Sequence, residues 1–303
     1  MLKEEPGFGT RAIDRRGDER DLEEIEMIDA QTELYGIIGN PVKHSLSPMI
    51  HNRAFRRMGL NAIYLAFEVK NLNEAIAGIR GLGIRGVSVT IPFKTEVVPF
   101  LDEVEGMAEK IKAVNTIVNK GGRLIGYNTD WCGALEAMEE KVDLKGKRAI
   151  ILGAGGSARA IAYGLILRGC QVIIVSRCKE KAIELAKEMG CLYGAQPNDP
   201  EVDVIINCTP VGMYPLDDQT LLPREALRRE MTVMDVVYQP LRTRFLREAE
   251  ERGCRTIDGL EMLAHQGAAQ LEIWTGMKPE IMEIKEDLCQ VLGIEINRKK
   301  NDD

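Results

Sequence analysis

Histidine and aromatic residues are scarce in this 303-residue sequence, and its cysteines form no C-x-x-C pair. There are 3 histidines, and the 7 cysteines stand at positions 132, 170, 178, 191, 208, 254 and 289. Because no metal-ligand spacing stands out among these residues, we expect no bound metal. An odd, scattered set of cysteines is typical of reduced core thiols, which favours a cytoplasmic protein over a disulfide framework.

The sequence also lacks long apolar runs and an excess of positive charge. No stretch is long enough to cross a bilayer, and the N-terminal region has no apolar segment of the kind found in secretory signals. The formal net charge is −7, whereas nucleic-acid binding requires a basic surface. We therefore expect neither membranes nor nucleic acids as partners. A chain of this length has room for two domains, each with its own core.

Charged residues dominate positions 1–30, which hold no sustained apolar period. We expect a mobile extension there that could include a short helix at 21–28. From residue 34 onward, strand-like and helix-like segments alternate. Strands are expected at 34–39, 62–68, 84–90, 149–152, 171–176, 203–207, 232–236 and 254–257, and helices at 48–58, 72–81, 130–141, 157–168, 242–252, 260–275 and 279–291. A hairpin is expected from 114–119 to 123–125, preceded by helical pieces between Pro92 and Ile111.

This alternation predicts an α/β fold of parallel sheets covered by helices. The last two helices follow a complete nucleotide-binding unit, so we expect them to return to the first half of the chain. The predicted parts are the extension at 1–30, a substrate-binding domain at 31–130 plus about 262–303, and a Rossmann-type doubly wound domain at 131–261. A cleft is expected between the two domains.

Residues 148–158, Arg-Ala-Ile-Ile-Leu-Gly-Ala-Gly-Gly-Ser-Ala, predict a buried strand, a glycine turn and the start of a helix. Gly153 permits a tight turn, Gly155 lets the backbone approach a pyrophosphate, and Ala158 allows the helix to pack closely on the strand. The free N–H groups at the start of the helix favour phosphate charge. The pattern indicates a dinucleotide site, with an ordinary glycine turn between strand and helix as the alternative.

The end of the next predicted strand bears on which dinucleotide would bind. An NAD site is expected to carry Asp or Glu there, about 20 residues past the motif. This chain has Ser176 and Arg177 instead, with Lys181 close behind. A guanidinium can pair with a 2′-phosphate, which a carboxylate would repel, so the sequence favours NADP. The alternative is that these basic residues only begin a solvated helix.

Two charged residues follow predicted strands in the first half of the chain. Lys94 comes directly after the strand that ends near Thr90, and Asp130 follows the second strand of the hairpin. In parallel sheets, ligands bind in the crevice at the carboxyl ends of the strands. Both residues are therefore candidates for the group that moves a proton in a hydride-transfer reaction. Taken singly, Lys94 could be a solvated loop lysine and Asp130 a plain helix cap.

Further motifs occur in order along the chain. They are Gly39-Asn40-Pro41-Val42-Lys43-His44-Ser45-Leu46-Ser47-Pro48, Val89-Thr90-Ile91-Pro92-Phe93-Lys94, Ala113-Val114-Asn115-Thr116, Asn128-Thr129-Asp130, Asn207-Cys208-Thr209-Pro210-Val211-Gly212-Met213 and Asp258-Gly259-Leu260-Glu261-Met262-Leu263. Together with the glycine motif, they closely resemble shikimate dehydrogenases from about Leu34 to Gly276. The resemblance implies NADPH-dependent, reversible reduction of 3-dehydroshikimate to shikimate, a step of aromatic amino-acid (chorismate) biosynthesis.

The resemblance also implies roles for the matching residues. Lys94 and Asp130 look like the catalytic pair beside the reacting C3 oxygen, where Asp130 would orient the Lys94 ammonium. Arg177 looks like the partner of the 2′-phosphate. Substrate binding is implied for Ser45, Ser47, Thr90, Lys94, Asn115, Asp130, Tyr238 and Gln266. NADP binding is implied for Gly153, Ala154, Gly155, Gly156, Ser157, Ala158, Arg159, Ser176, Arg177, Lys181, Thr209, Val236, Gly259 and Met262.

Several of these residues also have simpler interpretations. Ser45 and Ser47 flank a proline turn and could only cap a helix. Tyr238 could be a core aromatic, and Gln266 could lie on a solvent-facing helix surface. The three histidines, His44, His51 and His265, have no carboxylate at a spacing that would partner them, which favours structural roles.

The sequence departs from the family pattern at two positions. Ser88 stands where many shikimate dehydrogenases have asparagine, which could weaken one hydrogen bond to the substrate. Trp131 stands where glycine is frequent, which could narrow or shield the mouth of the cleft.

Three other functions remain open at this point. The closest is a quinate/shikimate dehydrogenase of broader specificity that could use NAD. A non-catalytic NADP-binding regulator with the same fold is the second, and the retention of both Lys94 and Asp130 weighs against it. The third is a scaffold for a partner enzyme, which would require residues 1–30 to dock specifically. As to assembly, we expect a monomer or a homodimer.

Overall fold

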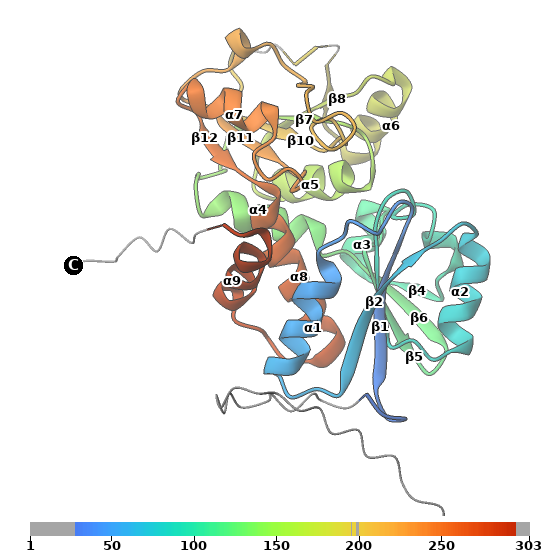
Figure 1. Ribbon diagram of the computed structural model, residues 1–303. Coiled ribbons are helices and arrows are strands. Elements are labelled where there is room, and N and C mark those ends of the chain that lie inside the picture. The colour runs from blue at the N-terminus through green and yellow to red at the C-terminus, as the bar shows by residue number, and fades with distance from the viewer. Residues whose placement is uncertain (1–27, 195, 198–199, 295–303) are drawn as a thin grey trace, which may run out of the picture.

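The computed structural model describes residues 28–194, 196–197 and 200–294. Residues 1–27 lie outside the described part of the chain. They include most of the extension expected at 1–30 and residues 21–27 of the helix expected at 21–28. The described chain forms two α/β halves, each built on a six-stranded sheet (Figure 1). Among the described residues, no helix is both long and apolar enough to cross a membrane.

The first sheet has the spatial order β2-β1-β3-β5-β6-β4. Its strands are β1 (Glu33–Gly39), β2 (Ala62–Glu68), β3 (Gly86–Val89), β4 (Glu103–Val104), β5 (Thr116–Lys120) and β6 (Arg123–Tyr127). The predicted parallel pairing holds for β1 with β2 and β3 and for β4 with β6, and the predicted hairpin forms between β5 and β6. The sheet is mixed because β5 also runs antiparallel to β3. Gly121 and Gly122 adopt positive φ angles of 61° and 93°, and the tight turn they form brings β6 back alongside β5.

Helices cover both faces of the first sheet. They are α1 (Ser47–Arg57), α2 (Leu72–Gly81), α3 (Gly106–Ile111), α8 (Gly259–Thr275) and α9 (Ile281–Leu292), with a short 3₁₀ helix at Val98–Phe100. On one face, Phe55 of α1, Leu271 of α8 and Leu288 of α9 belong to a single buried cluster. On the other face, Ile79 of α2 packs with Val87 of β3. The predicted return of the last two helices to the first half is confirmed.

The second sheet is parallel throughout and has the order β12-β11-β10-β7-β8-β9. Its strands are β7 (Arg148–Leu152), β8 (Gln171–Val175), β9 (Leu192–Tyr193), β10 (Val204–Asn207), β11 (Thr232–Asp235) and β12 (Arg255–Ile257). Its helices are α5 (Gly156–Leu167), α6 (Lys179–Met189) and α7 (Arg244–Glu251), with a 3₁₀ helix at Arg224–Ala226. The chain leaves β7 toward β8 on one side, and β10 lies on the other side. This reversal of strand order is the place where doubly wound folds bind ligands.

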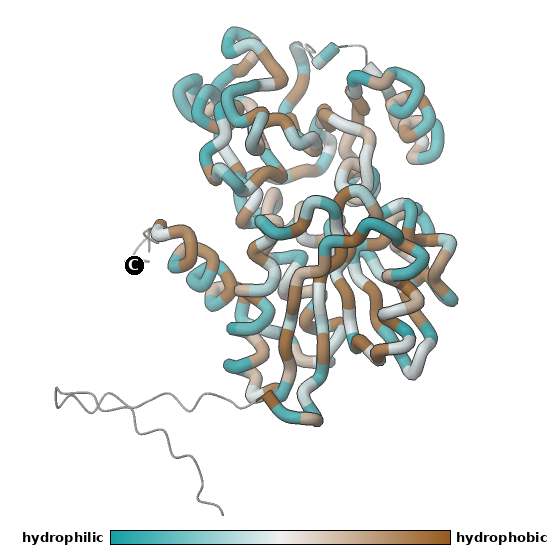
Figure 2. The backbone as a smooth tube through the Cα atoms, turned by 45° about the vertical axis from the view of Figure 1, so that its right-hand side comes forward, coloured by the Kyte–Doolittle hydropathy of each residue, from teal (hydrophilic) through white to brown (hydrophobic). Residues whose placement is uncertain are grey.

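Helix α4 (Asp130–Glu139) connects the two halves and packs against α8. The two helices cross so closely at Gly133 that a Cβ there would lie 2.7 Å from the backbone nitrogen of Gln266. Figure 2 shows hydrophilic stretches on outer loops and helix turns, and hydrophobic stretches running through both halves. The division of the chain into domains at 130/131 and 261/262 stays a prediction, although α4 and α8 begin close to those positions.

Candidate active site

A cavity of about 390 Å³ lies between the two halves. Eight lining residues are the predicted substrate-binding residues: Ser45, Ser47, Thr90, Lys94, Asn115, Asp130, Tyr238 and Gln266. Five more come from the set predicted to bind NADP: Ser157, Thr209, Val236, Gly259 and Met262. The structure thus brings together, in one cavity, residues that the sequence places more than 200 positions apart.

The remaining residues predicted to bind NADP lie outside the cavity lining. They occupy the turn from β7 into α5 and the segment after β8: Gly153, Ala154, Gly155, Gly156, Ala158, Arg159, Ser176, Arg177 and Lys181. Both segments follow the carboxyl ends of neighbouring parallel strands, so they lie at the same edge of the second sheet. A dinucleotide held there would extend from this edge toward the cavity.

Lys94 and Asp130 form an ion pair in the cavity. The Lys94 Nζ lies 2.7 Å from Asp130 Oδ2, and the two side chains are only 13% and 4% exposed. Asp130 is the first residue of α4, but the cap position is Thr129, and Asp130 bonds to cavity residues instead. Lys94 also donates to Ser157 Oγ at 3.1 Å, on the first turn of α5. The Lys94 ammonium therefore contacts both halves of the molecule. The interpretations of Lys94 as a solvated loop lysine and of Asp130 as a plain helix cap are wrong.

Asn115 has a fixed orientation beside this pair. Its Oδ1 accepts from the backbone N–H of Thr129 at 2.8 Å, which can only donate. Its Nδ2 therefore faces the other way and donates to Asp130 Oδ1 at 2.9 Å. Gln266 Nε2 donates to the carbonyl of Leu263 at 3.0 Å, which leaves its Oε1 facing Asn115. Because Gln266 is only 8% exposed, the interpretation of a solvent-facing residue is wrong.

Ser45 lies two residues before α1 and Ser47 is its first residue, so neither serine occupies the cap position. The cap position is Leu46, and no side chain caps this helix end. Ser45 Oγ accepts from the backbone N–H of Ser47 at 3.2 Å, and both serines line the cavity. Tyr238 lines the cavity too and packs against the core cluster of α1 and α8. Burial raises the pKa of Tyr238, and its hydrogen bond to Ser45 partly offsets that effect.

The glycine turn after β7 is shaped for close approach by a ligand. Gly153 has φ +116°, a conformation that side chains disfavour. No atom lies within 4 Å of where a Cβ of Gly155 would be, and no side chain caps the start of α5. The N–H groups there are available to a phosphate, so this turn fits a dinucleotide. At Gly156, a Cβ would lie 2.7 Å from the Cβ of Lys94, so this glycine lets the lysine approach α5.

The basic residues near this turn differ in their partners. Arg177 and Lys181 are exposed, and neither has a carboxylate partner in the described part of the chain. Arg159 instead forms an ion pair with Glu188, which also contacts Lys112 at 3.1 Å. The free guanidinium of Arg177 is thus the better candidate for a 2′-phosphate, in agreement with the sequence.

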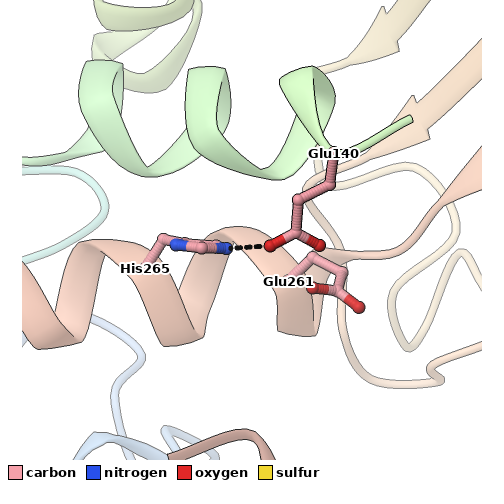
Figure 3. Close-up of side chains that lie close together, drawn as sticks. All are labelled: Glu140, Glu261 and His265. Atoms are coloured by element: carbon pink, nitrogen blue, oxygen red, sulfur yellow. Dashed lines mark hydrogen bonds and ion pairs between the residues drawn. The ribbon is translucent and has the colours of Figure 1, made fainter. Parts of the chain in front are cut away.

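His265 corrects the expectation that no carboxylate would partner a histidine. Its Nδ1 lies 2.8 Å from Glu136 of α4. Its Nε2 lies 3.1 Å from Glu140, the residue that follows α4 (Figure 3). The contacts arise from the packing of α4 on α8, which sequence spacing does not show. Glu140, Glu261 and His265 also lie close enough to hold a metal ion, but the Lys285 ammonium contacts both carboxylates, at 3.0 and 2.7 Å. A cation of the protein itself, the Lys285 ammonium, therefore already contacts the carboxylates of this cluster.

Trp131 does not narrow the cleft mouth, contrary to the expectation from sequence. It is half-buried, packs against the cores beneath α4 and α5, and meets Tyr163 edge-on at 6.4 Å between ring centroids. The residue is absent from the cavity lining. Because α4 begins at Asp130, the side chain one position later points to another side of the helix.

Sequence reasoning singled out Ser88 but missed its buried partners Tyr64 and Gln270, and it missed Asp235. Ser88 accepts from the hydroxyl of Tyr64 at 2.6 Å and donates to Gln270 Oε1 at 2.9 Å. Gln270 stands four residues after Gln266, one turn along the same face of α8, and that spacing could have identified it. Asp235, at the end of β11, is fully buried and hydrogen-bonded to Asn207 and Thr243. Burial raises the pKa of Asp235 to about 7.

Comparison with known proteins identifies the family to which this constellation belongs. The family model for the shikimate dehydrogenase substrate binding domain matches residues 37–117, that for shikimate / quinate 5-dehydrogenase matches 136–236, and that for the shikimate 5'-dehydrogenase C-terminal domain matches 259–286. A shikimate dehydrogenase (NADP(+)) of Pyrococcus abyssi is 46% identical over 86% of this chain and 99% of its own length.

Solved structures agree with the sequence comparison. A crystal structure of a shikimate dehydrogenase in complex with NADP⁺ superposes with a TM-score of 0.83 at 44% identity, over 89% of this chain and 98% of that chain. A shikimate 5-dehydrogenase from Thermus thermophilus in complex with NADP(H) and shikimate gives 0.80 at 37% identity, over 86% and 99% of the two chains. The chain belongs to the shikimate dehydrogenase family.

Proposed function

We propose that this protein is an NADP-dependent shikimate dehydrogenase that reversibly reduces 3-dehydroshikimate to shikimate. The observation that carries the proposal is the buried ion pair of Lys94 and Asp130, which lies in the cavity and touches the start of α5 through Ser157. The relatives support it, since they include proteins named for this activity and a structure that holds both NADP(H) and shikimate.

The ion pair supplies the proton chemistry of the reaction. Bound NADPH supplies the hydride that reduces the carbonyl carbon. The Lys94 ammonium then donates a proton to the oxygen on which negative charge develops. Asp130 holds the ammonium in place through Oδ2, while its Oδ1 is held by Asn115. In the oxidation direction the same nitrogen accepts the proton of the alcohol.

The other cavity residues would bind and orient the substrate. Ser45 and Ser47 present hydroxyl groups that suit the substrate carboxylate. Thr90, Asn115 and Gln266 present groups that suit the ring hydroxyls, and Tyr238 also lines the cavity. Fixed hydrogen bonds within the protein keep the Asn115 and Gln266 amides in one orientation, which lowers the entropic cost of holding the substrate.

The preference for NADP rests on the segment after β8. Arg177 and Lys181 are exposed and free of carboxylate partners among the described residues, and the sequence has no acidic residue at the end of this strand. A 2′-phosphate would give Arg177 a charge-assisted, bidentate partner. All seven cysteines are free thiols, which supports a reducing compartment such as the cytoplasm.

A quinate/shikimate dehydrogenase is the second candidate, because the family model that matches residues 136–236 covers both activities. The regulator interpretation does not explain the retained contact between Lys94 and Asp130. The scaffold interpretation depends on residues 1–30, nearly all of which lie outside the described chain. Assembly as a monomer or a homodimer stays a prediction.

One spectrophotometric assay tests the proposal. The protein is mixed with shikimate or quinate and with NADP or NAD, and the appearance of reduced nicotinamide is followed. We expect the highest kcat/KM for shikimate with NADP. A higher kcat/KM for quinate, or for NAD, would favour the second candidate. Absence of reduction with all four combinations would contradict both.

A further inference from the structure

Four buried side chains behind the cavity form a continuous line of hydrogen bonds. They are Tyr64 of β2, Ser88 of β3, Thr116 of β5 and Gln270 of α8, each 4% exposed or less. Ser88 and Gln270 also line the cavity, so the line of hydrogen bonds reaches the substrate-binding space. The direction of each hydrogen bond in this set can be assigned, because Gln270 also bonds to a backbone carbonyl group, which can only accept.

The backbone fixes the amide of Gln270. Its Nε2 donates to the carbonyl oxygen of Asn115 at 3.1 Å and to Thr116 Oγ1 at 3.0 Å. A backbone carbonyl can only accept, so the amide nitrogen must lie on this side. Both of its hydrogens are then used, and Oε1 faces Ser88. Gln270 therefore presents only an acceptor to Ser88.

This acceptor determines what Ser88 can do. Ser88 Oγ lies 2.9 Å from Gln270 Oε1, and a serine hydroxyl has one proton, so that proton is directed to Gln270. Tyr64 donates to Ser88 Oγ at 2.6 Å, and burial raises the pKa of Tyr64, so the phenol keeps its proton. Ser88 Oγ is left with one lone pair and no proton for a ligand in the cavity.

We propose that Gln270 is a specificity-determining residue that acts through Ser88, making position 88 an acceptor only. The cavity then selects a ring substituent that donates a hydrogen bond, namely a hydroxyl, over one that can only accept, such as a carbonyl or ether oxygen. An asparagine at position 88 could present either its amide nitrogen or its amide oxygen, whereas this serine presents one kind of group. The inference rests on the proposed function, since it concerns the same ring-binding cavity.

The test uses shikimate analogues in which each ring hydroxyl in turn is replaced by fluorine, which is similar in size but cannot donate. Binding is measured by calorimetry with NADPH present, because shikimate cannot be oxidised by the reduced dinucleotide. For the native protein we expect one analogue to bind about ten- to a hundredfold more weakly than shikimate, because the Ser88 acceptor is left unpaired. The quantity compared is the ratio of the dissociation constant of this fluorinated analogue to that of shikimate. In Gln270→Met the Ser88 proton is free to turn toward the ligand, so this ratio should fall at least fivefold.

Two further variants separate this effect from a general loss of structure. Thr116→Val removes two hydrogen bonds, one accepted from Gln270 Nε2 and one donated to Asn115 Oδ1. It leaves the bond between Ser88 and Gln270, so the ratio should stay as in the native protein. Ser88→Ala removes the acceptor itself and should abolish most of the discrimination, which keeps the test decisive if Gln270→Met does not fold. The affinity for NADP reports folding of each variant.

Two results would overturn the proposal. One is a ratio of the two dissociation constants that stays unchanged in Ser88→Ala or in folded Gln270→Met, because all ligands bind more weakly by the same factor. The other is an equal fall of the ratio in Thr116→Val. Failure of the proposed function would look different, because the native protein would then not oxidise shikimate with NADP at all.

Discussion

The two sides of the cavity are built by different means. On the side of the first sheet, buried side chains from distant segments hold one another: Lys94 bonds to Asp130, Asp130 to Asn115, and Ser88 to Gln270. On the side of the second sheet, the fit for a ligand comes from the main chain of the turn at Gly153–Gly156 and from exposed basic residues. Substrate recognition thus depends on hydrogen-bond partners, whereas nucleotide recognition depends on space and charge.

The largest effect is expected from disrupting the ion pair of Lys94 and Asp130 on the side of the first sheet. Asp130→Asn removes the charge that holds the Lys94 ammonium, so kcat should fall by roughly 10²- to 10⁴-fold. The dissociation constant for NADPH should stay nearly unchanged, because Asp130 does not lie at the nucleotide turn. Steady-state kinetics with shikimate and a fluorescence titration with NADPH measure the two quantities. Asp217→Asn, at an exposed loop position, is the control, and a kcat loss of similar size in that variant would contradict the role of Asp130.

A smaller effect is expected from reversing the charge of Arg177, on the side of the second sheet. Arg177→Asp replaces the free guanidinium with a group that repels a 2′-phosphate, so the preference for NADP over NAD should fall by about ten- to a hundredfold. The measure is the ratio of kcat/KM for the two dinucleotides. Arg56→Asp makes the same charge change at an exposed position in the last turn of α1 and should leave the ratio unaltered. If Arg177→Asp also leaves it unaltered, the selectivity comes from other residues.

The open space at Gly155 allows nucleotide affinity to be tested separately from protein stability. Gly155→Ala adds a Cβ that meets no protein atom within 4 Å at a φ of −91°, so the thermal midpoint should change little. The same Cβ would occupy space predicted to hold a phosphate, and the affinity for NADP should fall about tenfold, which corresponds to 1.4 kcal/mol. Isothermal calorimetry and thermal unfolding measure the pair of effects. Full NADP affinity in this variant would place the pyrophosphate elsewhere.

The last prediction concerns stability rather than catalysis. The folded pKa of Asp235 is about 7, above its ordinary value of 3.8, so the folded protein binds this proton more tightly than the unfolded chain. The free energy of unfolding should therefore fall as pH rises from about 4 to 7, by up to about 1.4 kcal/mol per pH unit from this group. Asp235→Asn cannot ionise and should lose that part of the slope.

Thermal unfolding of Asp235→Asn and native protein across this pH range measures the difference in slope. We expect the two curves of midpoint against pH to diverge by about 2–4 °C per pH unit. Parallel curves would show that the Asp235 carboxyl keeps its ordinary pKa. Asp217→Asn, whose carboxyl is exposed, should follow the native curve.

The same contrast explains how far the sequence could predict the structure. The glycine turn, its strand and its helix are local features, and the dinucleotide site could be predicted from residues 148–158 and Arg177 alone. The strand ends also marked Lys94 and Asp130 as candidates. Their specific roles came from the resemblance to a family, because an ion pair between residues 36 positions apart leaves no periodic signal.

The parts that sequence reasoning missed depend on contacts between distant segments. Ser88 and Gln270 lie 182 positions apart, and His265 contacts Glu136 and Glu140, which lie 129 and 125 positions away. β4 and β9 have two residues each, too few to show an alternating pattern. The expectation for Trp131 was wrong because it assumed a position at the cleft, whereas the first turn of α4 directs the side chain toward α5.

The central claim is that Lys94 carries the proton while hydride passes between the dinucleotide and the substrate. The most direct test is the single-turnover rate of NADP reduction by shikimate in Lys94→Ala, with Lys120→Ala, at an exposed hairpin turn, measured beside it. We predict a rate roughly 10²- to 10⁴-fold below native for Lys94→Ala, with NADP affinity nearly unchanged and Lys120→Ala at the native rate. A rate within a fewfold of native for folded, shikimate-saturated Lys94→Ala would contradict the claim.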